Sequence, residues 1–382
     1  MANINDYLLW RGDLPINDKF SFNEIDSMIL ARFSYLRFDK IKVEPLETIE
    51  SISNKMKDLD NEEFRYNGDK ELITYLGQSE RFKNMVVTDF VQLDDKEIEK
   101  QFGAITIHIS DDEIYVSFIG TDATIMGWKE DFNMGFLENV PCQLAGKEYL
   151  SEIAEKYKNT MIRVGGHSKG GNVAIFSVIT ASKEIQDRII KVYNYDGPGF
   201  NNEIIEKYAN QKIINQIETY ISQDSVIGRV LNHKEKITVV QSVQKGLLQH
   251  DIYSWQVLKT NPITLEKNTQ ISEDIKNALN TWLDETTNEQ RKIFIDSIFE
   301  LFYSTEAETF GEISATLMQN IIKILRKYTE ISKEDRKTIT EMIIIFVKAY
   351  FSVIKERETI KIKQGKEILL ASEEALEENE NV

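Results

Sequence analysis

The sequence predicts an α/β fold, with a mostly parallel central sheet flanked by helices and an α-helical C-terminal extension. Before about residue 260, short strand-like runs alternate with helical patterns, which indicates a parallel sheet. After that point only helical patterns follow, and the last residues are rich in Glu. We therefore expect an α/β core with a helical N-terminal segment (1–260), an α-helical region (261–370) and an acidic disordered tail (371–382).

The elements of the core alternate regularly. Ile25, Ile29 and Leu36 share one face of an early helix, and two alternating runs around Ser110 predict a hairpin. The expected elements that follow are strands at Ala104–Ile109 and Glu113–Ile119, a helix at Gln143–Tyr157, a strand at Met161–Gly165, a helix at Lys169–Ile179, a strand at Arg188–Tyr195, a helix at Glu203–Ala209, and strands at Gln216–Ile221 and Lys236–Val240.

The C-terminal region carries its own helix signals. Leu279 and Trp282 fall on one face of a first helix. Thr287, followed three residues later by Gln290, has the form of a capping box that opens a second helix through Phe302. We expect a third helix at 310–328 and a fourth, beginning near residue 332, that continues past residue 354.

The composition excludes several classes of function. The chain has 382 residues and is 41% hydrophobic, enough to bury a large core. Its 63 acidic and 46 basic residues give a net charge of −17, which argues against nucleic acid as a partner. The single cysteine, Cys142, excludes a disulfide within the chain and any multi-cysteine metal site. We expect neither a metal nor an organic cofactor.

No targeting or membrane segment is visible in the sequence. Residues 1–11 lack the basic and then apolar pattern of a secretion signal. The most apolar stretch, Met342–Val347, is too short to span a bilayer. The expectation is a cytoplasmic protein without stable membrane insertion. Signal-less export stays open, because such routes leave nothing to read in a sequence.

The most informative motif is Gly166-His167-Ser168-Lys169-Gly170. It is a G-x-S-x-G pentapeptide between a predicted strand and a predicted helix, which is the context of the nucleophile elbow of α/β-hydrolases. Glycines on both sides allow the tight turn, and the serine hydroxyl then projects from the edge of the sheet. Ser168 is therefore our candidate nucleophile, with the Lys169 backbone N–H facing the developing oxyanion.

A serine nucleophile needs a base, and the chain has four histidines. His108 lies in the predicted hairpin, His167 adjoins the nucleophile on a sharp turn, and His233 precedes the last predicted strand. His250 follows that strand, at the carboxyl edge of the sheet where catalytic groups gather. We expect His250 to be the base.

The acid of a triad should follow a strand between Ser168 and His250. Asp196 follows one predicted strand, but Asp196-Gly197-Pro198-Gly199 also has the composition of a turn. Asp224 follows the next strand, and its structural alternative is a helix N-cap. Position favours Asp224 without deciding the question.

These residues resemble a known family. Gly166-His167-Ser168-Lys169-Gly170-Gly171-Asn172 is similar to the G-H-S-x-G-G signature of class 3 (fungal-type) lipases, and Phe118-Ile119-Gly120-Thr121 with Gly127-Trp128-x-x-Asp131 resembles their F-R-G-T…W-x-x-D segment. The set more closely resembles a bacterial, Mbeg-like family of α/β-hydrolases of unassigned role. That likeness runs from residue 6 to about 325 and includes segments beginning at Asp6, Asp196 and Gln249.

The resemblance implies further roles. In the lipase pattern the triad acid stands where Asp224 lies, so the resemblance favours Asp224 over Asp196. It also implies that Thr121 joins Lys169 in the oxyanion hole, while Asp131 and Trp128 brace that loop. Ile119 stands where lipases usually have Arg, which removes no catalytic group.

The resulting hypothesis is a serine hydrolase that cleaves small-molecule or lipid esters through a Ser-Asp-His triad and an acyl-enzyme. Thioester or peptide hydrolysis and acyl transfer would use the same residues. A different alternative is a non-catalytic binding module on a hydrolase fold. The presence of candidates for all three triad residues disfavours it. The helical region at 261–370 is expected to shape a pocket or to engage a partner.

Overall fold

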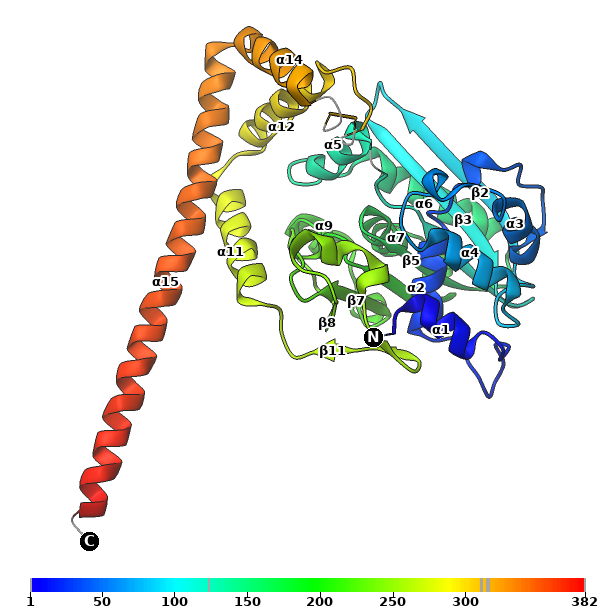
Figure 1. Ribbon diagram of the computed structural model, residues 1–382, viewed down its shortest axis with the longest axis horizontal. Helices are drawn as coiled ribbons and strands as arrows, with labels where there is room; N and C mark the ends of the chain where they lie inside the picture. Colours follow the sequence, from blue (N-terminus) through cyan, green and yellow to red (C-terminus); the bar gives the residue numbers. More distant parts are fainter. Residues whose placement is uncertain (1, 123, 310–311, 314–316, 381–382) are drawn as a thin grey trace.

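The computed structural model describes residues 2–122, 124–309, 312–313 and 317–380 (Figure 1). Over these residues, a nine-stranded sheet has the order β1-β2-β3-β4-β5-β6-β7-β8-β11. Its strands are β1 (Glu47–Thr48), β2 (Val86–Asp95), β3 (Lys100–His108), β4 (Glu113–Phe118), β5 (Met161–His167), β6 (Ile189–Tyr195), β7 (Ile217–Ser222), β8 (Ile237–Val240) and β11 (Thr264–Leu265). A separate two-stranded ribbon joins β9 (Val257–Leu258) to β10 (Asn261–Pro262).

The sheet has a parallel centre and antiparallel edges. Strands β4 to β8 pair in parallel, whereas β1 to β4 and the β8–β11 pair are antiparallel. The predicted hairpin is the β3–β4 pair, and the predicted fold class is confirmed. Phe118 lies opposite Gly166, and His167 opposite Tyr195. The carboxyl ends of β4, β5 and β6 therefore meet at one edge, where their following residues gather.

Helices cover both faces of the sheet (Figure 1). One face packs on helices from the N-terminal segment, and its core includes Ile29 and Ile107. The other face packs chiefly on α6 and α7, and its core includes Val116 and Val173. The helices before residue 260 are α1 (Ile4–Arg11), α2 (Glu24–Phe33), α3 (Ile49–Met56), α4 (Asp69–Gln78), α5 (Ile125–Asn133), α6 (Pro141–Lys156), α7 (Lys169–Ile179), α8 (Lys183–Gln186), α9 (Asn202–Tyr208) and α10 (Gln211–Ile214), with short 3-10 turns at η1 (Phe38–Lys40), η2 (Asn61–Glu63), η3 (Ile227–Arg229), η4 (Gly246–His250) and η5 (Ile252–Ser254).

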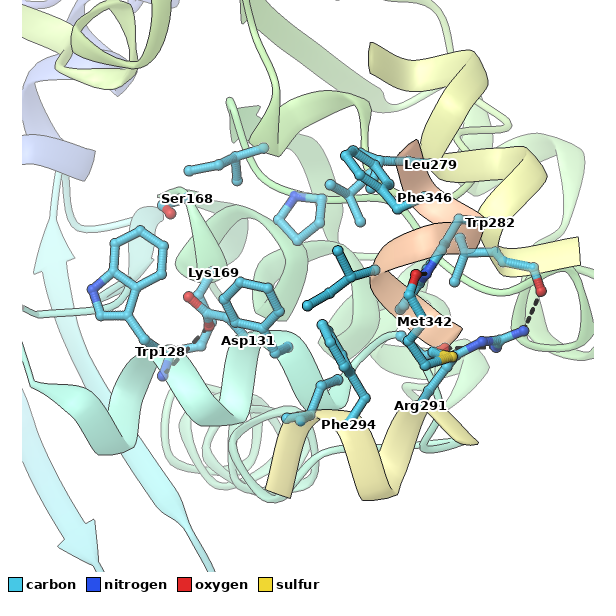
Figure 2. Close-up of a pocket in the computed structure, with 18 residues that line it drawn as sticks. Trp128, Asp131, Ser168, Lys169, Leu279, Trp282, Arg291, Phe294, Met342 and Phe346 are labelled. Carbon is cyan, nitrogen blue, oxygen red and sulfur yellow. Dashed lines mark hydrogen bonds and ion pairs between the residues drawn. The ribbon is translucent and has the colours of Figure 1, made fainter. Parts of the chain in front are cut away.

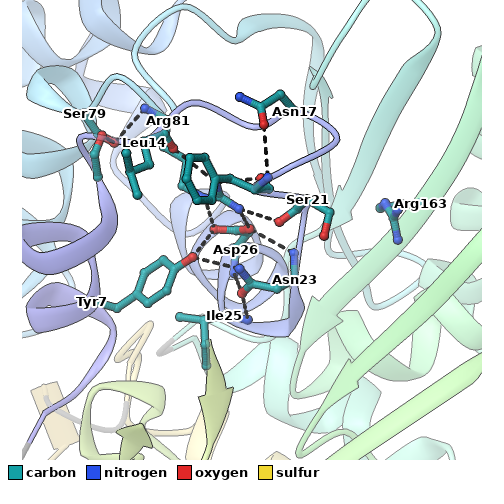
Figure 3. Close-up of polar contacts among 12 residues, drawn as sticks. Tyr7, Leu14, Asn17, Ser21, Asn23, Ile25, Asp26, Ser79, Arg81 and Arg163 are labelled. Carbon is teal, nitrogen blue, oxygen red and sulfur yellow. Dashed lines mark hydrogen bonds and ion pairs between the residues drawn. The ribbon is translucent and has the colours of Figure 1, made fainter. Parts of the chain in front are cut away.

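A buried polar network fixes the N-terminal helices (Figure 3). Arg81 Nε donates to Asp26 Oδ1 at 2.7 Å, and both side chains are fully buried. The Tyr7 hydroxyl donates to the same carboxylate oxygen at 2.8 Å and accepts from Asn23 Nδ2. Arg81 also donates to the carbonyl oxygens of Leu14 and two further residues. Because a buried charge is costly unless it is paired, this network ties α1 and α2 to the loop before β2.

The C-terminal region is helical from residue 270 and stands beside the core (Figure 1). Its helices are α11 (Gln270–Glu285), α12 (Asn288–Tyr303), α14 (Leu317–Glu330) and α15 (Lys333–Glu380). The predicted capping box is present, since Gln290 N donates to Thr287 Oγ1 and Gln290 Oε1 accepts from Thr287 N. Part of the third helix expected at 310–328 lies outside the described residues. The strands β10 and β11 follow residue 260, so the change to helices comes later than expected.

The last segment differs from the expected disordered tail. The backbone of α15 is helical through Glu380, and residues 381–382 lie outside the described residues. The charge pattern alone suggested a solvated tail, but Glu, Ala and Leu, which dominate this segment, are strong helix formers. In the part of the chain that the structure describes, the search for a helix able to cross a membrane finds none.

Candidate active site

Ser168 occupies a tight turn between the end of β5 and the start of α7. Its backbone has φ 57° and ψ −132°, a conformation that costs a residue with a side chain about 1–3 kcal/mol. A Cβ on Gly166 would lie 2.4 Å from the carbonyl carbon of Gly170, and one on Gly170 would lie 2.2 Å from the Phe118 carbonyl oxygen. Only glycine fits at these two positions, so the sequence motif is explained by the packing of the turn.

Thr121 lies beside this turn because the chain leaves β4 through Gly120. A Cβ on Gly120 would lie 2.4 Å from the His167 carbonyl oxygen, so the close approach requires glycine. Thr121 is buried, and its Oγ1 donates to Asp131 Oδ2. This hydrogen bond joins Asp131 to Thr121, and the bracing role expected of Asp131 stays a prediction. Trp128 faces the cavity described below.

The imidazole of His250 is held by Asp196. Its Nδ1–H donates to Asp196 Oδ2 at 2.7 Å, and the carboxylate is 1% exposed while the His250 side chain is 22% exposed. Asp196 follows β6 directly, with φ 55°, and its other oxygen accepts from Ser225 Oγ. With Nδ1 committed as a donor, Nε2 of the neutral ring is the nitrogen able to accept a proton.

Asp224 does not contact His250 in this way, so the prediction of Asp224 as its acid partner is wrong. Asp224 Oδ2 instead accepts from Gln249 Nε2 at 2.6 Å and from Gly246 N at 3.0 Å. Asp224 lies beyond β7 and faces the backbone of η4, whereas Asp196 leaves the neighbouring β6 in a left-handed turn toward the imidazole. In the sequence, the turn-like composition of Asp196-Gly197-Pro198-Gly199 counted against Asp196, although this carboxylate is the one that contacts His250.

His167 fixes the backbone of His250. Its Nε2–H donates to the His250 carbonyl oxygen at 2.7 Å, and the two ring centroids are 4.5 Å apart. Burial, with His250 close by, holds the pKa of His167 well below its usual range, so this ring is neutral. His108 lies within β3, and His233 Nδ1 is 2.8 Å from Glu235 Oε1. None of these three is the partner of Asp196.

The Lys169 side chain points away from the nucleophile into a buried polar cluster. Its Nζ donates to Glu130 Oε2 at 2.9 Å and to Gln101 Oε1 at 2.8 Å. Burial opposes the charge on Lys169, but the carboxylates of Glu130 and Asp131 outweigh it and raise the pKa of the ammonium group. Glu130 Oε1 also accepts from Cys142 N, so the cluster links α5, α6 and α7 behind the turn.

Asp131 is a carboxylate near Ser168 with one buried oxygen that lacks a hydrogen-bond partner in the described structure. Burial raises the pKa of Asp131 to about 6, although Lys169 and the hydrogen bond from Thr121 oppose the shift. Its Oδ1 is 4.0 Å from Lys169 Nζ and, within the described structure, has no hydrogen-bond partner. Asp131 therefore carries a charge that is only weakly favoured at neutral pH.

A cavity of about 360 Å³ opens from Ser168 toward the C-terminal helices (Figure 2). Half of its 18 lining residues lie in α11, α12 and α15. The sequence placed several of these side chains on helix faces but could not predict that they line a cavity, because the cavity joins segments more than a hundred residues apart. Over the described part of the chain, no group of three or more His, Cys, Asp or Glu residues is arranged to hold a metal ion.

A family model described as Mbeg1-like matches residues 76–300, which is more than half of the chain. A search of curated proteins gave no match. Among solved structures, a fungal lipase–inhibitor complex is 12% identical with a TM-score of 0.38, covering 57% of this chain and 78% of that one. Lipase II from Rhizopus niveus is 11% identical (TM-score 0.32, coverage 44% and 69%), and a lipase from Rhizopus microsporus var. chinensis is 14% identical (TM-score 0.33, coverage 54% and 72%).

Proposed function

We propose that this chain, which belongs to the Mbeg1-like family, is a serine hydrolase that cleaves carboxylic esters through Ser168, His250 and Asp196. The observation that carries the proposal is the buried His250–Asp196 hydrogen bond at the edge of the sheet where Ser168 is held at φ 57°. A strained serine, an imidazole and a carboxylate at the ends of neighbouring elements are the arrangement that nucleophilic catalysis uses.

The proposed reaction begins when Ser168 Oγ attacks the ester carbonyl carbon. His250 Nε2 takes the hydroxyl proton, and the Asp196 carboxylate stabilises the imidazolium through Nδ1–H. The imidazolium then donates its proton to the alcohol oxygen as the C–O bond breaks. Water attacks the acyl-enzyme in the second half, with His250 again as the base, and the acid product leaves Ser168 free.

Two groups are proposed to bind the oxyanion. Lys169 is the first residue of α7, so its backbone N–H has no carbonyl four residues earlier within that helix. The N-terminal end of α7 also favours negative charge. Thr121 supplies the second donor from the strand end that Gly120 brings against the turn. Asp131, which accepts from Thr121 Oγ1, would hold that residue in place.

The proposal specifies the acyl group of the substrate more closely than its leaving group. A triad does not specify the leaving group, so thioester hydrolysis and acyl transfer would use the same acyl-enzyme. An ester with a good leaving group therefore tests the shared step before the natural acceptor is known.

The experiment compares hydrolysis of p-nitrophenyl butyrate by the wild-type chain and by Ser168→Ala. We expect kcat to fall by about 10⁴-fold or more, because no other group replaces the nucleophile. Circular dichroism checks that the variant is folded. A folded Ser168→Ala protein that keeps wild-type turnover would overturn the proposal.

A further inference from the structure

The cavity beside Ser168 divides by polarity along its length. Ser168, Lys169 and Asp131 lie at one side, whereas Leu279 and Phe346 lie across the cavity from Ser168 (Figure 2). The Lys169 ammonium group is turned into its cluster with Glu130 and does not offer its charge to the cavity. Apart from these three polar residues and Arg291, the cavity is lined by apolar residues and one glycine, so a chain that extends from a carbonyl at Ser168 meets apolar side chains.

The one cation on the far wall is already bound to protein. Arg291 donates to the carbonyl oxygens of Gly135 and Thr286 and to Asn288 Oδ1. Burial lowers the pKa of Arg291, and the charge of Asp284 opposes that shift only in part. Arg291 thus closes the junction of α11 and α12, and its five hydrogen bonds to protein oxygens leave no free N–H group to donate to a ligand. The occupant of this part of the cavity must be uncharged and apolar.

The apolar wall is fixed to the core at both ends. Ser272 Oγ, in the first turn of α11, donates to the Ser225 carbonyl oxygen at 2.6 Å. Lys129 Nζ, in α5, lies 2.9 Å from Asp296 Oδ1 in α12. Trp282 Nε1 donates to the Met342 carbonyl oxygen at 3.0 Å and so joins α11 to α15. The wall has a defined shape, and its α15 part lies outside the residues 76–300 that the family model matches.

We propose that this cavity is an acyl pocket whose far wall is supplied by α11, α12 and α15, and that it selects esters of medium-length acyl chains. The inference rests on the proposed function, because the acyl carbonyl is placed at Ser168. A volume of about 360 Å³ has room for a chain of roughly ten carbons, since a methylene group fills about the volume of one water. Octanoyl and decanoyl esters are the expected optimum.

The first test fills the far end of the pocket. In Leu279→Trp, we expect kcat/KM for p-nitrophenyl octanoate and decanoate to fall about tenfold or more, while the acetate and butyrate esters keep theirs, because short chains do not reach this wall. The matched control is Ile271→Trp, on the same helix at a side chain that is 63% exposed and does not line the cavity. It should leave the whole chain-length profile unchanged.

The second test enlarges the pocket from a different helix. Phe346→Ala should move the optimum toward longer esters such as the dodecanoate, whereas Phe351→Ala, at an exposed position of α15 outside the cavity, should not. A profile that is flat in the wild-type chain, or that responds equally to the cavity variants and their controls, would overturn the acyl pocket.

A binding measurement separates this inference from the proposed function. Trp128 and Trp282 line the cavity, so decanamide binding to the Ser168→Ala variant should change tryptophan fluorescence. A second substitution in that variant, Leu279→Trp, should weaken decanamide binding about tenfold. The control substitution Ile271→Trp should leave it unchanged. If decanamide binds but a fluorophosphonate does not label Ser168 of the wild-type chain, the acyl-pocket proposal stands and the proposed hydrolase function is refuted. Labelling without decanamide binding and with a flat ester profile would keep the hydrolase and refute the pocket.

Discussion

The α/β core and the C-terminal helices meet the same cavity with different kinds of side chain. The core supplies Ser168, Lys169 and Asp131 as well as apolar residues such as Trp128, whereas the helices supply, apart from Arg291, only apolar groups such as Trp282 and Phe346 (Figure 2). Each polar group of the core is positioned by a strand end or a buried contact. Under the proposed function, the core would determine which bond is broken and the helices would determine which acyl chain fits.

The two regions also differ in how deeply they bury ion pairs. The core buries ion pairs whose side chains are at most 1% exposed, such as Arg32 with Asp69. An ion pair within the helices, Lys292 with Asp296, is far more exposed. Substitutions of buried charges in the core should therefore cost far more stability than equivalent changes on the helices. The following predictions test this contrast, beginning with the largest effect.

The largest contrast lies between two aspartates of the core. Asp196→Asn should lower kcat for an ester by about 10⁴-fold, because an amide at this position favours the wrong tautomer of His250. Asp224→Asn should lower it by about tenfold or less, since Asp224 contacts the η4 loop and not the imidazole. Steady-state kinetics of both variants measures the difference. Equal losses would show that the loop, and not the Asp196 hydrogen bond, controls the base.

The same substitution in the two regions should differ in its effect on the free energy of unfolding. Lys169→Met leaves Glu130 buried without its cation and should cost about 3–5 kcal/mol. Lys292→Met removes an exposed pair with Asp296 within α12 and should cost less than about 1 kcal/mol. Urea unfolding measures both values. A small loss for Lys169→Met would mean that the cluster behind the turn does not hold the core together.

The Asp131 carboxyl should make the core less stable as the pH rises. Its pKa is raised to about 6 in the folded chain, against about 3.9 unfolded, so the folded state holds this proton more tightly. Its contribution to stability is full below about pH 4 and is lost between about pH 4 and pH 6, an effect of about 3 kcal/mol. Asp131→Asn should remove that fall. Urea unfolding at several pH values measures it, and identical pH profiles for the two proteins would contradict the buried carboxyl.

The smallest expected effect concerns the strain at Ser168. Ser168→Gly should raise the free energy of unfolding by about 1 kcal/mol, because glycine tolerates the left-handed backbone that serine does not. Thermal unfolding measures the gain. In the helical region, Ser304→Gly serves as the control, since Ser304 follows α12 with φ −62° and stores no such strain. A loss of stability in Ser168→Gly would show that the turn is not strained.

Much of the core could be predicted from local sequence signals. The strand, turn and helix around Ser168 follow from the spacing of the glycines, and α7 has the predicted bounds Lys169–Ile179. The capping box at Thr287 located the start of α12. These features depend on residues within one or two turns of each other, so a single stretch of sequence contains the information.

Other features depend on contacts that no local pattern shows. Strand β2 (Val86–Asp95) escaped prediction because its second half is polar, partly exposed and held by pairing with β3. Asp196 and Asp224 each follow a strand, and only the direction of the chain after β6 decides which carboxylate reaches His250. The residues of the pocket wall could not be predicted either, because this requires knowing that α11, α12 and α15 line one cavity beside Ser168.

The most direct test of the central claim is to map the site of covalent modification. The wild-type chain is treated with a fluorophosphonate, digested, and the adduct is located by mass spectrometry, with Asp196→Asn and Asp224→Asn treated in parallel. The triad predicts a single adduct on Ser168, formed far more slowly in Asp196→Asn and at nearly the wild-type rate in Asp224→Asn. An adduct on another residue, or none on the folded wild-type chain, would contradict it.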